Sequence, residues 1–267
     1  MTKEELVKSI SDKLITNMVD LKRFYNESNP HTSTKYFVID DLLNPRITSE
    51  IFNSFPSKDK LNLRDTFREK KYTSANFDSE LLNNITDAFQ DPVVIKVIGD
   101  ITSIDKLIND SSLYAGGISR MDKGHFLNPH IDNSHNGNRS LYRRLNLLFY
   151  VTPDYRQEYG GNFELWDKKV KKPIEIPSFF NRLVVMETTT SSWHSVSPVL
   201  HDVSRCCVSN YFFTSESPDK NDYYHVTSFL GRPDEKLKRL YGRLDNILRN
   251  TFATVTGISR GRKLTRK

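Results

Sequence analysis

Cysteine is almost absent from this sequence: its 267 residues include only Cys206 and Cys207, which are adjacent. Neighbouring residues of a strand point to opposite faces, so we expect no disulfide between these two. A structural zinc site built on thiolates needs more cysteines than the chain has. The sequence therefore indicates a reduced protein, and we expect a cytoplasmic location.

Long hydrophobic runs are also missing. No stretch approaches the roughly 20 apolar residues that a membrane-spanning helix needs. Residues 1–15 contain acidic side chains and no continuous apolar segment, so we expect no secretory signal there. Apolar residues recur at helical spacing in this segment and predict an amphipathic helix: Leu6, Ile10, Leu14 and Ile15.

The positive charge lies almost entirely at one end of the chain. The net charge is +6, but residues 231–267 hold eleven Lys or Arg and three acidic residues, so the remainder carries about −2. This basic segment could contact nucleic-acid phosphates. The body lacks an evident aromatic and basic surface on which bases would stack, so we favour a solvated helix with a frayed end. Nucleic acid remains the alternative partner, and its candidate contacts are Lys236, Lys238, Arg239, Arg243, Arg249, Arg260, Arg262, Lys263, Arg266 and Lys267.

The order of predicted elements divides the chain into three parts. Residues 1–34 form an N-terminal helix and linker, residues 35–230 the main domain, and residues 231–267 a basic C-terminal helix and tail. Short runs rich in β-branched and aromatic residues, separated by turn signals, predict an antiparallel sandwich or barrel in the main domain. These runs are Tyr36–Ile39, Leu113–Ser119, Leu145–Val151, Asn162–Trp166, Leu183–Thr188 and Cys206–Phe213.

Helical spacing returns around these strands. It predicts helices over Ile47–Phe55, Ser79–Phe89, Val93–Ile98 and Asp234–Arg249. Residues 57–76 are polar and basic, and we expect them to form an exposed excursion.

Two histidines lie in settings typical of a metal site. His130 and Asp132 are two residues apart, so on an extended segment their side chains project to the same side. His194 follows 64 residues later, after an apolar strand and a short turn of Thr and Ser. A His-x-Asp tripeptide alone is common by chance, but this ordered set is not. Two imidazoles and one carboxylate match the facial ligand arrangement of non-haem Fe(II) oxygenases, so we predict these three as metal ligands and catalytic residues.

Arg205 is the candidate anchor for an anionic cosubstrate. It lies eleven residues after His194 and opens an otherwise apolar strand, so it needs an anionic partner if it is buried. A guanidinium matches the geometry of a carboxylate, as a dicarboxylate cosubstrate would require. The alternative is an arginine at the rim in a surface ion pair, and this strand alone favours neither.

Together these residues resemble the 2-oxoglutarate/Fe(II)-dependent dioxygenase superfamily, in particular its prolyl-hydroxylase-like branch. The resemblance covers residues 113–214 and includes the His-x-Asp motif, Gly160–Trp166, His194 and Arg205. It implies a mainly β fold with flanking helices, whose core is a double-stranded β-helix or jelly roll. It also makes residues 35–230 an oxygenase domain.

Carried over by position, the resemblance assigns further roles. His130, Asp132 and His194 match the iron ligands, and Arg205 matches the residue that binds the distal carboxylate of 2-oxoglutarate. Tyr150 matches a tyrosine that shares this carboxylate. Asn146 lies on the same strand face as Tyr150 and is also predicted to face the cosubstrate. Arg120 stands where prolyl hydroxylases often have tyrosine, a departure that concerns the substrate rather than the iron.

The implied activity is hydroxylation of an unactivated C–H bond in a peptidyl (prolyl-type) or small-molecule substrate. It would use Fe(II), 2-oxoglutarate and O2, with ascorbate as a reductant, and release succinate and CO2. The alternatives are a nucleic-acid-directed oxidative demethylase and a non-catalytic, cupin-like metal- or ligand-binding module. Residues 57–76 and the loop 133–143 are expected to border the mouth of the site.

Three other aromatic or imidazole side chains near these motifs are not predicted to bind metal or substrate. We expect His125 and His135 in surface loops, and Trp193 as a packing residue.

Overall fold

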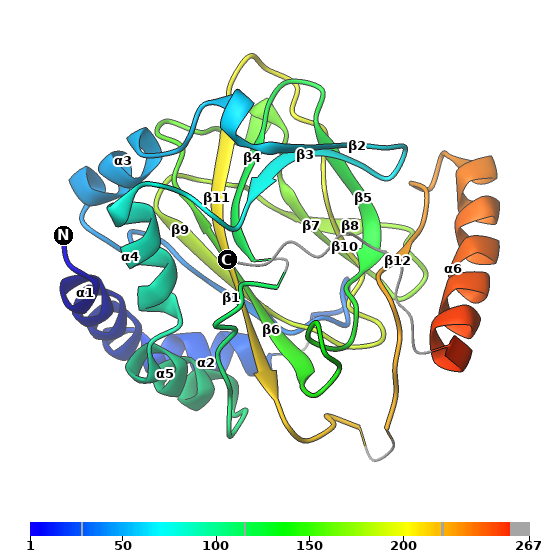
Figure 1. Cartoon of the computed structure of the whole chain (residues 1–267), viewed down its shortest axis with the longest axis horizontal. Helices are drawn as coiled ribbons and strands as arrows, with labels where there is room; N and C mark the ends of the chain where they lie inside the picture. Colours follow the sequence, from blue (N-terminus) through cyan, green and yellow to red (C-terminus); the bar gives the residue numbers. More distant parts are fainter. Residues whose placement is uncertain (28, 115, 220–221, 257–267) are drawn as a thin grey trace.

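The computed structural model describes residues 1–27, 29–114, 116–219 and 222–256. A curled antiparallel sheet forms its centre, and the N-terminal helices pack together at one side of the sheet (Figure 1). The fold is therefore mainly β with flanking helices, as predicted. The tail residues Arg260, Arg262, Lys263, Arg266 and Lys267 lie outside the described residues.

The strands form two connected groups. The first group runs in the order β1 (Tyr36–Ile39), β9 (Arg182–Glu187), β6 (Tyr142–Tyr150), β11 (Arg205–Thr214) and β4 (Gly117–Met121). The second runs in the order β5 (Phe126–Ile131), β10 (His194–Val196), β7 (Phe163–Trp166) and β8 (Pro173–Ile176). Strand β3 (Glu69–Ser74) pairs with both β4 and β5 and joins the groups. Two short strands complete the sheet, β2 (Asn62–Asp65) beside β3 and β12 (Ser228–Phe229) beside β5.

Five helices belong to the N-terminal half: α1 (Lys3–Thr16), α2 (Met18–Asn26), α3 (Pro45–Asn53), α4 (Glu80–Phe89) and α5 (Pro92–Thr102). Helix α1 begins at a capping box in which Thr2 and Glu5 satisfy each other's backbone N–H groups. It packs against α4 and α5 through Leu6, Ile10 and Leu14. Ile15, predicted on the same face, is exposed instead.

The alternation along β6 separates the apolar core from the cavity. Leu145, Leu147 and Phe149 are buried in the core that includes the helices. Asn146 and Leu148 face the opposite way and line a cavity inside the sheet. This is the division that the pleat of the strand predicted.

Residues 57–76 are not an excursion, so this prediction was wrong. After the short 3-10 helix η1 (Lys58–Lys60), they form the β2–β3 hairpin. The apolar alternation of a strand is missing here because one face of β3 lines the polar cavity rather than a core. Strands β5, β8 and β10 also escaped prediction, since β5 contains Pro129 and β10 has three residues.

The long helix α6 (Lys236–Thr256) lies at the edge of the molecule, next to β12 and apart from the other helices (Figure 1). Its side chains bond to the backbone of β12: Asn246 accepts from the N–H of Phe229 at 3.0 Å and donates to its carbonyl at 2.9 Å. A second 3-10 helix, η2 (Gln157–Tyr159), precedes β7. Within the described residues, no helix is long and apolar enough to cross a membrane. The division into three domains stays a prediction.

Candidate active site

Neighbouring strands bring the three predicted metal ligands together. His130 lies near the end of β5 and His194 opens β10, and the antiparallel pairing places these two residues directly opposite each other. Their ring centroids are 4.1 Å apart. Asp132 follows immediately after β5, so the pair from the His-x-Asp motif and the distant histidine face one point.

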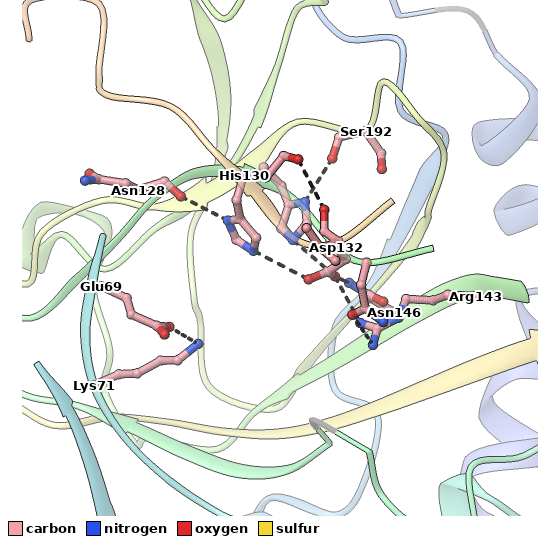
Figure 2. A network of polar contacts seen from close by, with 12 residues as sticks. Glu69, Lys71, Asn128, His130, Asp132, Arg143, Asn146 and Ser192 are labelled. Atoms are coloured by element: carbon pink, nitrogen blue, oxygen red, sulfur yellow. Dashed lines mark hydrogen bonds and ion pairs between the residues drawn. The ribbon is translucent and has the colours of Figure 1, made fainter. Parts of the chain in front are cut away.

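The ligand atoms of these residues converge. Nε2 of His130 lies 3.7 Å from one Asp132 carboxylate oxygen, and Nε2 of His194 lies 3.6 Å from the other. One ligand atom from each of the three residues falls within 4.8 Å of the others. Each imidazole donates its Nδ1–H to a carbonyl at 2.9 Å, His130 to Asn128 and His194 to Ser192 (Figure 2). These bonds leave the Nε2 lone pairs directed at the common point.

The charges of the cluster also suit a metal. Burial lowers the pKa of His130 to about 3, and the neighbouring His194 adds to this effect. Burial likewise lowers the pKa of His194. Burial alone would raise the pKa of Asp132, but Arg143, the two histidines and the Asn146 hydrogen bond together outweigh it and keep that pKa below its ordinary value. Two neutral imidazoles and one carboxylate are a donor set for a divalent cation such as Fe(II).

Two further side chains fix the orientation of Asp132. Asn146 donates its amide N–H to Asp132 Oδ2 at 2.6 Å, and Nη1 of Arg143 lies 3.3 Å from the same oxygen (Figure 2). Arg143 is itself buried, lies 4.1 Å from the ring centre of Tyr211 and donates to Asn133. Arg143 was not predicted as a site residue, because it lies just before the predicted strand Leu145–Val151; its place next to that apolar run was the available signal.

Removal of the Asn146 amide is expected to weaken metal binding. In Asn146→Ala, Asp132 loses its shortest hydrogen bond, and we expect a loss of roughly 10- to 100-fold in Fe(II) affinity, measured by anaerobic calorimetry. Asn138→Ala changes an exposed asparagine of the neighbouring loop and should leave the affinity unchanged. Equal affinities for both variants would mean that Asn146 does not position Asp132.

Arg205 lies on the opposite wall of the same cavity, at the start of β11. It is buried, donates from Nε to the Ser178 hydroxyl at 2.9 Å, and lies 4.7 Å from the ring centre of Tyr150. Within the described part of the chain, no carboxylate lies within 4.0 Å of its guanidinium nitrogens, and the buried Tyr150 hydroxyl lies beside Arg205 and Ser178. A buried, uncompensated cation is costly, so this wall fits the carboxylate of a bound ligand. Its burial excludes the alternative of a surface ion pair at the rim.

The cavity has a volume of about 400 Å³, and its lining is rich in cationic side chains. The β2–β3 hairpin contributes Arg64 and Lys71, and the loop 133–143 contributes Asn136 and Arg139, so both segments line the cavity; their place at its mouth stays a prediction. Besides Arg143 and Arg205, the cationic lining residues are Arg64, Arg68, Lys71, Arg139 and Arg249. Among the described residues, the carboxylates of the lining are Glu69 and Asp132.

Glu69 balances part of this charge. It lies 2.9 Å from Lys71 and 3.3 Å from Arg64 (Figure 2). Burial alone would raise the pKa of Glu69, but the two cations lower it to about 2. The single negative charge of Glu69 thus offsets only one of the two positive charges of Lys71 and Arg64, and this part of the lining keeps a net positive charge.

The lowered pKa of Glu69 predicts a pH-dependent contribution to stability. Because the folded-state pKa lies below the unfolded-state value, the stabilisation is complete above pH 4.5 and is lost as the pH falls toward 2. We expect Glu69→Gln to lower the free energy of unfolding by about 3 kcal/mol at pH 7, with the difference shrinking between pH 4.5 and 2. Urea denaturation at several pH values measures this difference. Glu158→Gln, at an exposed ion pair, should change it by less than about 0.5 kcal/mol.

The expectation of surface positions for two other histidines was wrong. His125 and His135 are both buried, and His125 lies beside Tyr72 with ring centroids 5.3 Å apart. His135 is held by the Ser134 hydroxyl at 2.8 Å and by the ring of Tyr142. Neither lines the cavity. They are loop residues by sequence, but hydrophobic packing from neighbouring aromatic rings covers them. The packing role of Trp193 is confirmed by its contacts with an apolar cluster.

The comparisons with known proteins agree with this geometry. Residues 116–213, which contain all three candidate ligands and Arg205, match the 2OG-Fe(II) oxygenase superfamily. No curated protein matches the chain. Prolyl 4-hydroxylase from Phytophthora capsici is similar in structure, with 15% identity and a TM-score of 0.55 over 92% of this chain and 77% of that one.

Two bacterial structures are similar in the same way. A prolyl-4-hydroxylase from Pseudomonas putida has 13% identity and a TM-score of 0.51 over 73% of this chain and 98% of that one. An oxidoreductase of the 2OG-Fe(II) oxygenase family from Burkholderia pseudomallei has 13% identity and a TM-score of 0.50 over 74% and 90%. At these identities the likeness establishes the fold, the jelly roll that the sequence predicted.

The match of residues 116–213 to the 2OG-Fe(II) oxygenase superfamily and the fold point to the same class of protein. The predicted class of enzyme, a 2-oxoglutarate-dependent Fe(II) oxygenase, is thereby confirmed. The family matched by residues 116–213 implies Fe(II), 2-oxoglutarate and O2, and the cluster of His130, Asp132 and His194 could hold the metal.

Proposed function

We propose that this protein hydroxylates a prolyl-type peptide, with Fe(II) held by His130, Asp132 and His194 and 2-oxoglutarate anchored by Arg205. The observation that carries the proposal is that one cavity contains both a set of metal ligands and a buried cation that lacks an anionic partner. A convergent donor set lies on one wall, and a buried guanidinium without a carboxylate lies on the other. A dicarboxylate that chelates the metal at one end would satisfy both.

Each residue has a definite task in this scheme. When bound, Fe(II) and 2-oxoglutarate supply the oxidising chemistry, in which O2 is consumed, 2-oxoglutarate yields succinate and CO2, and a C–H bond gains a hydroxyl group. Asn146 and Arg143 hold Asp132 in place as a ligand. Arg205 would neutralise the distal carboxylate, and the neighbouring Tyr150 hydroxyl would share it. Ascorbate would keep the iron reduced between turnovers.

The choice of a peptide rests on the structurally similar prolyl hydroxylases and on the charge of the cavity lining. The Phytophthora and Pseudomonas proteins are prolyl 4-hydroxylases. The β2–β3 hairpin and the loop 133–143 both contribute cationic side chains to the lining of the cavity. Its excess of cations favours a peptide with acidic residues around the target proline.

Succinate formation tests this proposal. We expect slow formation from 2-oxoglutarate with Fe(II) and ascorbate in air, and faster formation when an acidic proline-containing peptide is added. A matched peptide with lysine in place of each acidic residue should stimulate less. Metal binding without any 2-oxoglutarate binding under anaerobic conditions would instead support the cupin-like binding module. Stimulation by methylated single-stranded DNA rather than by peptide would support the demethylase.

A further inference from the structure

Helix α6 faces the protein with its polar side. Besides Asn246, which bonds to both backbone groups of Phe229, Asn250 accepts from the N–H of Val226 at 2.9 Å. Arg239 donates to the carbonyl of Val170 at 3.0 Å, and Asp245 pairs with Arg68 of the hairpin at 2.5 Å. These contacts fix the rotation of the helix about its own axis.

The apolar side of α6 consequently points into solvent. Its large side chains recur at intervals of three and four residues and form one stripe. Their exposed fractions lie between 52% and 84%: Leu237, Leu240, Tyr241, Leu244, Ile247 and Leu248. A helix at the surface of a globular protein usually has the opposite orientation. A continuous exposed stripe of this kind marks a contact with something outside the described protein.

Positive charge borders the stripe. Lys236, Lys238 and Arg243 are exposed beside it. Within α6 the sequence has five Lys or Arg and one acidic residue, and residues 257–267 add five more basic residues and no acidic one. The surface that covers the stripe must therefore tolerate or attract a concentration of cations.

We propose that α6 attaches the protein to an anionic lipid surface. The leucine stripe would enter the boundary between headgroups and acyl chains, and the flanking lysine and arginine side chains would contact lipid phosphates. Leucine-rich apolar and basic polar faces on one helix are the combination that binds such a surface without crossing it. This attachment is independent of the reaction at the iron site.

The charge decides between this surface and a second copy of the chain. Pairing α6 with its own copy would cover the leucines but bring two helices of net charge +4 together. An anionic membrane covers the same leucines and is attracted by the same charges. The apolar surface also extends beyond α6 to the exposed Phe67 at the tip of the hairpin, whose ring centroid lies 5.6 Å from that of Tyr241. Such a ridge of aliphatic and aromatic side chains fits a planar interface.

Vesicle sedimentation with the full chain tests this proposal. We expect binding to vesicles of phosphatidylcholine and phosphatidylglycerol in a 3:1 ratio, weaker binding as salt increases, and little binding to pure phosphatidylcholine. The double variant Leu240→Glu, Leu244→Glu should reduce the partition coefficient roughly tenfold or more. Val19→Glu is the control because Val19 is an apolar residue on α2 that is even more exposed than the two leucines, and the variant should bind as the wild type does.

Other results would overturn the proposal. They are equal sedimentation with neutral and anionic vesicles, no sedimentation with either, or binding that survives the double variant. A dimer in analytical ultracentrifugation without lipid, dissociated by the same two substitutions, would assign the stripe to a second copy. Because both leucines are exposed, the variant should retain its folded circular dichroism spectrum and its Fe(II) binding, which separates a lost attachment from lost folding.

Discussion

Replacement of His130 by alanine is expected to abolish succinate formation and to weaken Fe(II) binding by more than about 100-fold. The change removes one of three converging donors and leaves Asp132 and His194 unable to hold the metal facially. Even residues that only orient a metal ligand contribute 10- to 100-fold to affinity, so loss of a ligand should exceed that range. Anaerobic calorimetry with Fe(II) and a succinate assay in air measure the two effects.

The control for this experiment is His31→Ala. His31 is exposed and lies outside the cavity, so its loss should change neither metal binding nor turnover. The assignment of the metal site fails if His130→Ala retains wild-type affinity while keeping its folded circular dichroism spectrum.

Replacement of Arg205 by glutamine should raise the Kd for 2-oxoglutarate by roughly 10- to 100-fold, because charge-assisted hydrogen bonds contribute about 1.5–3 kcal/mol. Turnover at saturating 2-oxoglutarate should change much less, since Arg205 binds the end of the cosubstrate remote from the reacting atoms. Fe(II) affinity should stay at the wild-type value. The KM for 2-oxoglutarate and anaerobic titration of the metal-loaded protein provide the measurements.

Arg182→Gln is the matched control for Arg205. Arg182 also starts a strand of the sheet, but its guanidinium pairs with Asp40 at a distance of 2.6 Å. Arg182 does not line the cavity. An unchanged KM in Arg205→Gln, or an equal increase in Arg182→Gln, would show that Arg205 does not anchor the cosubstrate.

The sequence predicted those parts of the site whose residue types and order carry chemical meaning. His130, Asp132 and His194 were identified because ligand type, strand periodicity and spacing agree, whereas Arg205 was assigned through the family resemblance. The structure brings all four to one cavity. Strand parity likewise placed Asn146 on the cavity face, although its observed partner is Asp132. The roles of Asn146 and Tyr150 toward the cosubstrate stay predictions.

The rest depended on contacts between distant segments. Strand β3 is held by backbone pairing with β4 and β5, which its polar side chains do not reveal. His125 and His135 are covered by aromatic rings that come from elsewhere in the fold or chain. The orientation of α6 is set by side-chain bonds to the backbone of β12, such as those of Asn246. The spacing of apolar residues along the helix does not predict these bonds. Local patterns predict elements, whereas these features follow from tertiary packing.

The direct pairing of His130 with His194 has a consequence for a chain that lacks disulfides. A metal ion held by both rings would act as a cross-link between two strands separated by 64 residues in sequence. Closing a loop of that length in advance removes conformational freedom from the unfolded chain. It would also pin the three-residue strand β10, whose register is interrupted by a bulge. Bound iron would thus stabilise this fold as a reversible cross-link. The cross-link would form only where the cell supplies the metal in reduced form.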